Sequence, residues 1–290
     1  MFNSNESSSY SLDDCNSEYD FSIDLSNSLS QNNSVKIPKI IMQTWKDKNI
    51  PEKWKSSPLS IKKYLPDWKY VLMTDEDNRN FVKKHFPNFL KYYDGFPHNI
   101  MRADAIRYCF LYVFGGLYMD LDFEILPPPR NHKGPHPINS LFTSDNEVYL
   151  VSSSNVGSYL TNSFMASKPG CKLWLDAIEY MKKPVPYYYI GKHLTVMHQT
   201  GSFMLSSVAK NSKIVYGNLP VKLILPCSVC NIKCRTKGAY LKQLEGSSWI
   251  TYDTKCYNFF MCNYKQLIIA VALILFVILI ALLIQWFNLI

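Results

Sequence analysis

Two aspartates separated by one residue, Asp120 and Asp122, are the side chains of this sequence best suited to chemistry. They end an apolar run that reads as a strand, in which alternate side chains share a face. Two carboxylates on one face repel each other unless a cation lies with them. Mn²⁺ or Mg²⁺ fits such a pair, because these ions take a few carboxylate oxygens and complete their shell with water and substrate phosphates. The pair therefore predicts a catalytic metal site that fixes a diphosphate and stabilises its charge as it leaves.

An Asp-x-Asp pattern is a weak signal by itself, and the chain contains a second copy at Asp75-Glu76-Asp77. That copy follows another apolar run, where capping of the next helix is the expected role. The context of Asp120 and Asp122 is more informative, since a helical segment, a double glycine and an apolar strand precede them directly. In open α/β sheets, ligands bind beyond the carboxyl ends of the strands. The later pair is thus the one we assign to function.

Polar and aromatic residues near this pair could support it. Asp104 and Arg107 are three residues apart on one helical face, where they form either a local ion pair or two contacts to a bound ligand. Tyr118 precedes Asp120 by two residues and is expected on the same face. Trp45 ends the first apolar run and either stacks on a base or fills the core.

The segments around these residues predict how they are positioned. Short apolar runs at 39–44, 68–73 and 117–125 read as strands, and residues 57–64, 78–86 and 99–114 read as helices. The helix at 99–114 has amphipathic spacing and ends at Gly115-Gly116. Strands that alternate with helices predict an α/β domain over residues 35–264, with an open, mostly parallel sheet and flanking helices.

The two ends of the sequence differ from this domain. Residues 1–34 are rich in Ser and Asn, carry acidic but no basic residues, and have too little apolar surface to fold, so we expect a disordered tail. Residues 267–290 contain no charge and span about 36 Å as a helix, which exceeds the ~30 Å hydrocarbon core of a bilayer. We therefore expect a single-pass membrane anchor over 265–290. Lys255 and Lys265 precede it, and the positive-inside rule predicts a cytoplasmic body.

Charge and cysteine usage leave alternatives open. The net charge of +8 suits anionic partners, but a solvated lysine-rich face explains it equally. Five of the eight cysteines lie between residues 227 and 262. Cys227, Cys230 and Cys234 have a spacing compatible with zinc, but no second ligand pair follows, so bystander thiols or a local disulfide are the alternatives.

Seven segments follow one another along the chain in the order of a known pattern: IPKIIMQTWKDKNIPEKW (37–54), TDED (74–77), RADAIRY (102–108), GGLYMDLD (115–122), NSFMASKPGCKLW (162–174), HQTGSFML (198–205) and GSSWITYD (246–253). Together they resemble the D-x-D glycosyltransferases of family 32, which includes initiating α-mannosyltransferases and inositol-phosphorylceramide mannosyltransferases. The resemblance implies a Rossmann-like GT-A fold, a Mn²⁺- (or Mg²⁺-) dependent reaction, a UDP- or GDP-sugar donor, a glycan or lipid acceptor, and retention of anomeric configuration. No nucleic-acid partner is expected.

The resemblance also implies a role for each matching residue. Asp120 and Asp122 correspond to the metal and diphosphate pair, Asp104 and Arg107 to donor-sugar contacts, and Trp45 to a residue near the base. The remaining donor-side residues are Tyr118, Asn162, Ser248 and Trp249, the last two in a C-terminal flap over the diphosphate.

Two positions depart from the family pattern. Met42 stands where relatives usually have His, and Leu244, Glu245 and Ile250 surround the GSSW segment, where relatives often have another His. His198 is expected on the acceptor side or in a structural role, because a retaining transfer needs no dedicated base beyond the leaving phosphate.

Three functions compete. The first is a membrane-anchored glycosyltransferase. The second is an inactive relative that binds nucleotide sugars as a membrane scaffold, a reading supported by the missing histidines. The third is a metal-dependent phosphotransferase or nuclease, but two-metal sites need further clustered acids and only Glu124 is near.

Overall fold

The computed structural model describes residues 37–142, 146–153, 159–184, 191–227, 230, 234, 236–246 and 248–287. The tail expected over 1–34 lies outside these ranges. The chain divides into a first unit that ends at Trp249 and a second unit that begins at Ile250. The boundaries at residues 35 and 265 stay predictions.

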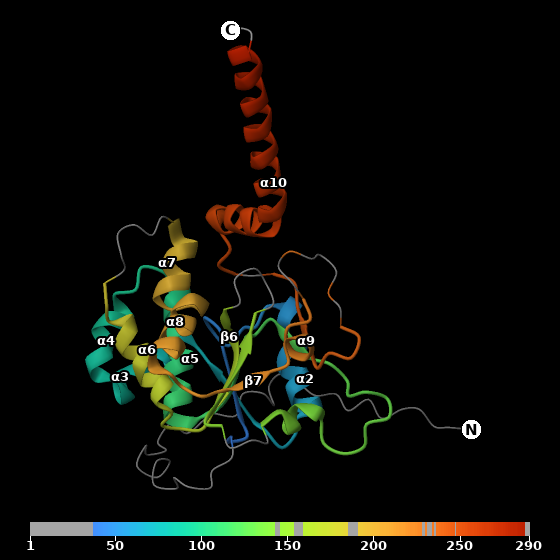
Figure 1. Cartoon of the computed structure of the whole chain (residues 1–290). Helices are drawn as coiled ribbons and strands as arrows, with labels where there is room; N and C mark the ends of the chain where they lie inside the picture. Colours follow the sequence, from blue (N-terminus) through green and yellow to red (C-terminus); the bar gives the residue numbers. More distant parts are fainter. Residues whose placement is uncertain are drawn as a thin grey trace. The chain divides into compact units, whose positions relative to one another are not determined.

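The first unit alternates strands and helices (Figure 1). Its strands are β1 (Ile40–Thr44), β2 (Lys69–Met73), β3 (Gly116–Met119), β4 (Phe123–Ile125), β5 (Val148–Ser152), β6 (Leu160–Ser167), β7 (Gly217–Leu219) and β8 (Leu241–Gln243). Its α-helices are α2 (Ser56–Tyr64), α3 (Asp75–His85), α4 (Pro87–Asp94), α5 (Asn99–Phe114), α6 (Lys172–Met181), α7 (Gly191–Gln199), α8 (Ser202–Ser212) and α9 (Val221–Ile224). Short 3-10 turns lie at Glu52–Trp54 and Pro137–Phe142.

The main sheet has the strand order β2-β1-β3-β6-β5-β7. Strand β6 is antiparallel to both of its neighbours, and the other pairs are parallel, so β6 alone of these strands runs against the rest. This confirms the expected class, an α/β GT-A arrangement with an open, mostly parallel sheet. The N-terminal strands β2, β1 and β3 point their carboxyl ends to one edge.

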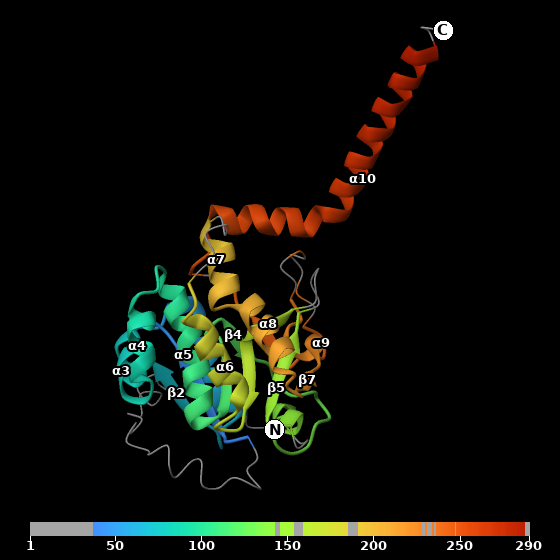
Figure 2. The ribbon, with the colours of Figure 1, turned by 60° about the vertical axis from the view of Figure 1, so that its left-hand side comes forward.

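Helices cover both faces of the sheet, and the strands alternate between two cores. Met42 of β1 packs into a core with α3, α5, α6 and α8, whereas its neighbour Ile41 packs into a core with α2. Figure 2 shows α5 and α6 lying over the strands. The sequence predicted an amphipathic helix at 99–114; the helix is found there, but α5 is buried on most of its sides. Helices α3 and α6 pack against α5, and the sheet packs against it too, so α5 has apolar residues on most of its sides.

The double glycine sets the turn from α5 into β3. Gly115 and Gly116 have φ angles of 63° and 87°, which side-chain-bearing residues rarely adopt. A Cβ atom on Gly116 would lie 2.5 Å from the carbonyl oxygen of Ile40, in the neighbouring strand. Glycine is therefore required both for the backbone angle and for the close approach of β3 to β1.

Two expectations about element boundaries need correction. The helix predicted over 78–86 begins at Asp75, because Thr74 and Asp77 form a capping box: the Asp77 amide donates to the Thr74 hydroxyl and the Thr74 amide donates to Asp77 Oδ2. The single strand predicted over 117–125 is two strands. It breaks at 120–122, where β3 leaves the main sheet and β4 enters a two-stranded sheet with β8.

The second unit contains α10 (Tyr252–Phe287), which follows a short lead-in. Its segment Tyr252–Trp286 is long and apolar enough to cross a membrane, with none of the most apolar stretch buried. This bears out the apolar C-terminal helix expected from the sequence, although the helix begins well before residue 267.

Candidate active site

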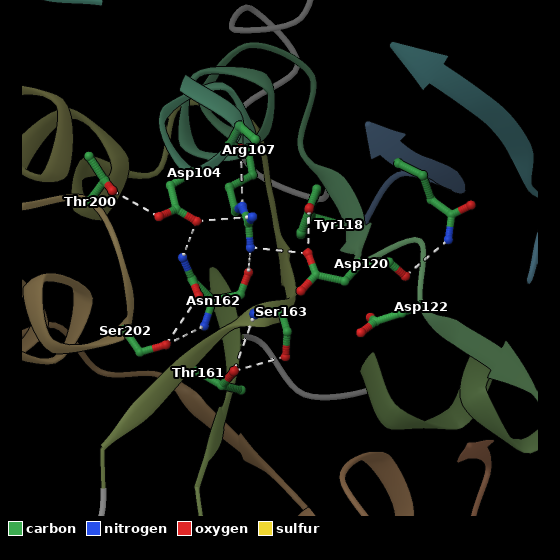
Figure 3. A network of polar contacts seen from close by, with 12 residues as sticks. Asp104, Arg107, Tyr118, Asp120, Asp122, Thr161, Asn162, Ser163, Thr200 and Ser202 are labelled. Atoms are coloured by element: carbon green, nitrogen blue, oxygen red, sulfur yellow. Dashed lines mark hydrogen bonds and ion pairs between the residues drawn. The ribbon is translucent and has the colours of Figure 1, made fainter. Parts of the chain in front are cut away.

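The functional residues predicted from the sequence gather where β1 and β3 end. Asp120 follows β3 directly, and its amide donates to the carbonyl oxygen of Ser163 in β6 at 2.9 Å. Its own carbonyl accepts from Gln43 Nε2 of β1 at 3.2 Å. The backbone at the break between β3 and β4 is therefore fixed from both neighbouring strands, and Figure 3 shows Asp120 and Asp122 on this loop.

One oxygen of Asp120 is held by protein groups. Tyr118 donates its hydroxyl to Asp120 Oδ1 at 2.5 Å, and Arg107 Nη1 lies 3.1 Å from the same oxygen. The Arg107 guanidinium also stands over the Tyr118 ring, 4.5 Å from its centroid. Both contacts are made to Oδ1, and the side chain is 29% exposed. Asp120 is thus oriented by Oδ1 and can bind a ligand through Oδ2.

Arg107 belongs to a buried polar network behind Asp120 (Figure 3). Its Nη2 lies 3.0 Å from Asp104 Oδ1, and its Nη1 donates to the carbonyl oxygen of Asn162 at 2.7 Å. Asp104 also accepts from Asn162 Nδ2 and from the Thr200 hydroxyl, while Ser202 donates to Asn162 Oδ1. Burial, the largest influence, lowers the pKa of Arg107, but Asp120, Tyr118 and Asp104 together more than offset it, so the pKa is raised overall and the guanidinium stays charged.

Asp122 has a different environment. Its Oδ2 accepts from Gln243 Nε2 at 3.3 Å, whereas Oδ1 is buried and has no hydrogen-bond partner among the residues described. Burial, with the nearby Asp120 carboxylate second, raises the pKa of Asp122 to about 7. Burial of a carboxylate oxygen without a hydrogen-bond partner costs free energy. Uptake of a proton or binding of a cation by Asp122 would remove this cost.

The donor set fits a hard divalent cation bound mainly by its substrate. Asp120 Oδ2 and Asp122 Oδ1 are the two oxygens that could hold it. Within the described ranges, His, Cys, Asp and Glu form no cluster of three or more that could enclose a metal. Mn²⁺ or Mg²⁺ tolerates two protein carboxylates when water and phosphate oxygens fill the other positions.

Three predicted donor contacts turn out to be bonded to one another. Asp104, Arg107 and Asn162 are brought together as predicted, but each is less than a tenth exposed and is engaged inside the network. Of the two readings of Asp104 and Arg107, the structure shows the local ion pair, and Arg107 also reaches the D-x-D loop. Their contact with a donor stays a prediction.

Trp45 lies beside the loop in a small aromatic and aliphatic cluster with Trp54 and Leu121. The two indoles meet edge to face at 4.9 Å. Trp45 is half-buried, and its buried Nε1 has no hydrogen-bond partner among the described residues. The ring therefore helps to pack the wall of the site.

The predicted flap residues lie apart from this network. Ser248 is exposed, and Trp249 stacks on His193 of α7 with the ring centroids 5.5 Å apart. His198 packs its ring against Phe203, and burial lowers its pKa. Met42 is fully buried in the core.

The sequence did not single out Gln43, Thr200, Ser202 or Gln243. Thr200 and Ser202 lie in the HQTGSFML segment, so the motif held a signal for them. Gln43 likewise lies in the matching segment at 37–54, whereas Gln243 lies in none of the matching segments and contacts a partner that is distant in the sequence.

The cysteine cluster contains a disulfide between Cys227 and Cys234. Of the alternatives left open by the spacing, the local disulfide is therefore the one observed for this pair, and these two residues are not thiolate ligands for zinc.

Comparison with known proteins places these features in a family. The profile described as "Glycosyltransferase sugar-binding region containing DXD motif" matches residues 51–143. Inositol phosphoceramide mannosyltransferase 3 of Schizosaccharomyces pombe is 33% identical over 77% of this chain and 58% of its own length. Inositol phosphoceramide mannosyltransferase 1 of the same organism is 30% identical over 84% of this chain and 72% of its own length.

This chain thus spans about three fifths of the first of these relatives. Among solved structures, the one described as PaToxG Glycosyltransferase is 16% identical, with a TM-score of 0.45, over 65% of this chain and 74% of that one.

Proposed function

This chain belongs to the family of glycosyltransferases with a DXD-containing sugar-binding region, and we propose that it transfers a hexose from a UDP- or GDP-sugar to a glycan or lipid acceptor. The proposal includes dependence on Mn²⁺ or Mg²⁺ and retention of anomeric configuration. The names of the two relatives favour mannose as the sugar and an inositol phosphoceramide headgroup as the acceptor.

The observation that carries the proposal is the pair of carboxylate oxygens at the break between β3 and β4. Asp120 is oriented through Oδ1 by Tyr118 and Arg107, while the buried Oδ1 of Asp122 has no protein partner among the described residues. Two oriented oxygens beyond the carboxyl end of a strand suit a cation–diphosphate complex. The cation supplies charge stabilisation for the departing diphosphate.

The protein's own residues bind and orient. Arg107 fixes the direction of Asp120 and is itself saturated by Asp104 and Asn162, so the loop is held in one geometry before a donor arrives. Such preorganisation is the means by which an active site favours a transition state over its ground state. Trp45 offers an indole face and an unpartnered N–H at the edge of the same loop, where a nucleotide base would be accommodated.

A second candidate function is an inactive protein that binds nucleotide sugars. The contact that favours it is the Arg107–Asp120 pair, because a neutralised Asp120 would bind a cation more weakly. Only the active transferase would turn over a donor sugar, so an assay of donor turnover distinguishes the two candidate functions.

The test uses the full chain in detergent micelles or nanodiscs with Mn²⁺ and a panel of UDP- and GDP-sugars. Release of nucleotide diphosphate is followed with and without inositol phosphoceramide. We expect turnover of one donor in the wild type, its loss in Asp122→Asn, and its retention in Asp75→Asn, the matched control from the other Asp-x-Asp segment. Binding of the nucleotide without turnover of any donor would favour the inactive protein, and neither binding nor turnover would exclude both.

We also propose which side of the membrane the body faces. The helix α10 could anchor the chain, and the lysines before it predicted a cytoplasmic body. The disulfide between Cys227 and Cys234 favours the opposite side, because disulfides persist in oxidising compartments and are rare in the cytosol. A two-lysine bias is the weaker of the two indications, so we infer a body on the oxidising side.

A further inference from the structure

The C-terminal strand β8 lies directly beside the D-x-D loop. It pairs antiparallel with β4, and Phe123 is opposite Gln243 in this register. The pairing continues past both strands, because the Leu244 amide donates to the carbonyl oxygen of Asp122 at 2.6 Å. One residue further, the Glu245 carbonyl accepts from the Trp54 indole at 3.2 Å. Backbone contacts therefore set the position of residues 241–245 against Asp122.

The side chain of Gln243 uses this placement to reach Asp122. Its Nε2 donates to Oδ2 at 3.3 Å, across 121 positions of sequence. The neighbouring Lys242 is opposite Glu124 in the register. Both Lys242 and Gln243 are exposed, but alternate residues of a strand point to opposite faces, so the Lys242 side chain leaves β8 on the other face. Gln243 is the residue of β8 that contacts the D-x-D pair.

We propose that Gln243 is a positioning residue, which holds Asp122 by Oδ2 so that Oδ1 faces the cation of the donor complex. The inference rests on the proposed function and assigns a residue to its site. The contact uses a neutral donor: a lysine here would neutralise Asp122 and compete with the cation, and a glutamate would repel it. A neutral amide orients the Asp122 carboxylate without neutralising it, so the negative charge remains free to interact with the metal.

The contact between Gln243 and Asp122 also gives strand β8 a role in the cation site. Residues that hydrogen-bond to metal ligands commonly change metal affinity when they are replaced, by about 10- to 100-fold. In this chain the supporting residue comes from a strand that the backbone of Asp122 itself helps to hold. The cation site is therefore complete only when β8 is paired with β4.

The test measures Mn²⁺ affinity by the electron paramagnetic resonance signal of free Mn²⁺, on the full chain in detergent with UDP or GDP present, after subtraction of the Mn²⁺ that the same nucleotide binds without protein. Gln243→Leu removes the amide, Gln243→His keeps a neutral donor of similar reach, and Lys242→Leu is the matched control on the same strand. We expect Mn²⁺ affinity to fall by about tenfold in Gln243→Leu, to stay within a few-fold of wild type in Gln243→His, and to be unchanged in Lys242→Leu. Melting temperatures of all variants are recorded in parallel.

The outcomes separate this inference from the proposed function. If wild type binds Mn²⁺, Asp122→Asn does not, and Gln243→Leu binds as wild type does, the positioning role is wrong and the cation site stands. If Gln243→Leu melts lower with unchanged Mn²⁺ affinity, the contact is only structural. If neither wild type nor Asp122→Asn binds Mn²⁺, the metal-dependent function and this inference both fall.

Discussion

Arg107 Nη1 lies 3.1 Å from Asp120 Oδ1, and this ion pair joins the helix before the double glycine to the loop after it. The same guanidinium contacts Asp104 on its own helix at 3.0 Å. One buried cation therefore holds two carboxylates from different elements. Because Arg107 is only 5% exposed at its side chain, its charge is weakly screened by water.

Replacing Arg107 by methionine should destabilise the protein strongly. The change keeps a long side chain but leaves Asp104 and Asp120 without their cation in a buried setting. Removing one partner of such a pair costs about 3–5 kcal/mol. The free energy of unfolding of the first unit, measured by urea denaturation of the detergent-solubilised chain, should fall by this amount.

The control for this change is Arg79→Met, which breaks an exposed ion pair with Asp94. Solvent screens that pair, so the loss should be far smaller. Equal losses in the two variants would show that the Arg107 network does not act as a buried unit.

Asp122→Asn should change stability in a pH-dependent way without metal. The pKa of Asp122 is raised to about 7 in the folded protein, above its ordinary value of 3.8, so the folded state keeps the proton longer than the unfolded state does. The wild type is thus fully stabilised by this group below pH 3.8 and loses that contribution as the pH rises through 7. Asparagine resembles the protonated form and does not titrate.

We therefore expect the melting temperature of Asp122→Asn to match that of wild type only below about pH 3.8 and to rise above it as the pH increases toward 7. Near pH 8 it should exceed that of wild type by roughly 2–4 °C for each kcal/mol of stability that wild type has lost. Differential scanning fluorimetry in a chelating buffer checks this. Adding Mn²⁺ should reverse the order at pH 8, because only wild type gains stability from the cation. A constant difference across the pH range would mean that Asp122 is not buried as an unpartnered acid.

Gly116→Ala should prevent correct packing of β3 on β1. Its φ of 87° makes alanine strained by about 1–2 kcal/mol, and the new Cβ would also lie 2.5 Å from the Ile40 carbonyl oxygen. Gly134→Ala is the matched control, since Gly134 has a φ of 104° but no atom within 4 Å of the new Cβ. Soluble yield and melting temperature should drop far more for Gly116→Ala; similar effects would leave the backbone angle as the whole cause.

Local patterns were sufficient to predict much of this fold. The helix at 99–114 and the strands near 39–44 and 68–73 are long enough to show their apolar periodicity, and the glycines mark the turn between helix and strand. The D-x-D pair could be assigned because all these signals lie within one continuous stretch.

The rest depends on contacts between distant segments. Strands β4 and β8 have three residues each, too few for a period-two pattern, and they are stabilised by pairing with each other. The break in the strand at 120–122 goes with a change of partner, because β3 pairs with β6 whereas β4 pairs with β8, and both partners are distant in the sequence. For the same reason the role of Gln243 could not be predicted, because a lone polar residue in a short strand carries no signal without its partner.

The last prediction concerns the side of the membrane on which the body lies, and it follows from the disulfide between Cys227 and Cys234. If the body lies on the oxidising side, it should be protected from protease in intact microsomes and cleaved once detergent is added. The sequons at Asn5 and Asn32 should then acquire glycans, and Asn5→Gln with Asn32→Gln should remove the mobility shift. A cytoplasmic body would be cleaved without detergent and would carry no glycan, and its cysteines at 227 and 234 would react with maleimide without prior reduction. The protease result decides between the two sides, because protection depends on where the body lies and not on whether a given sequon is used.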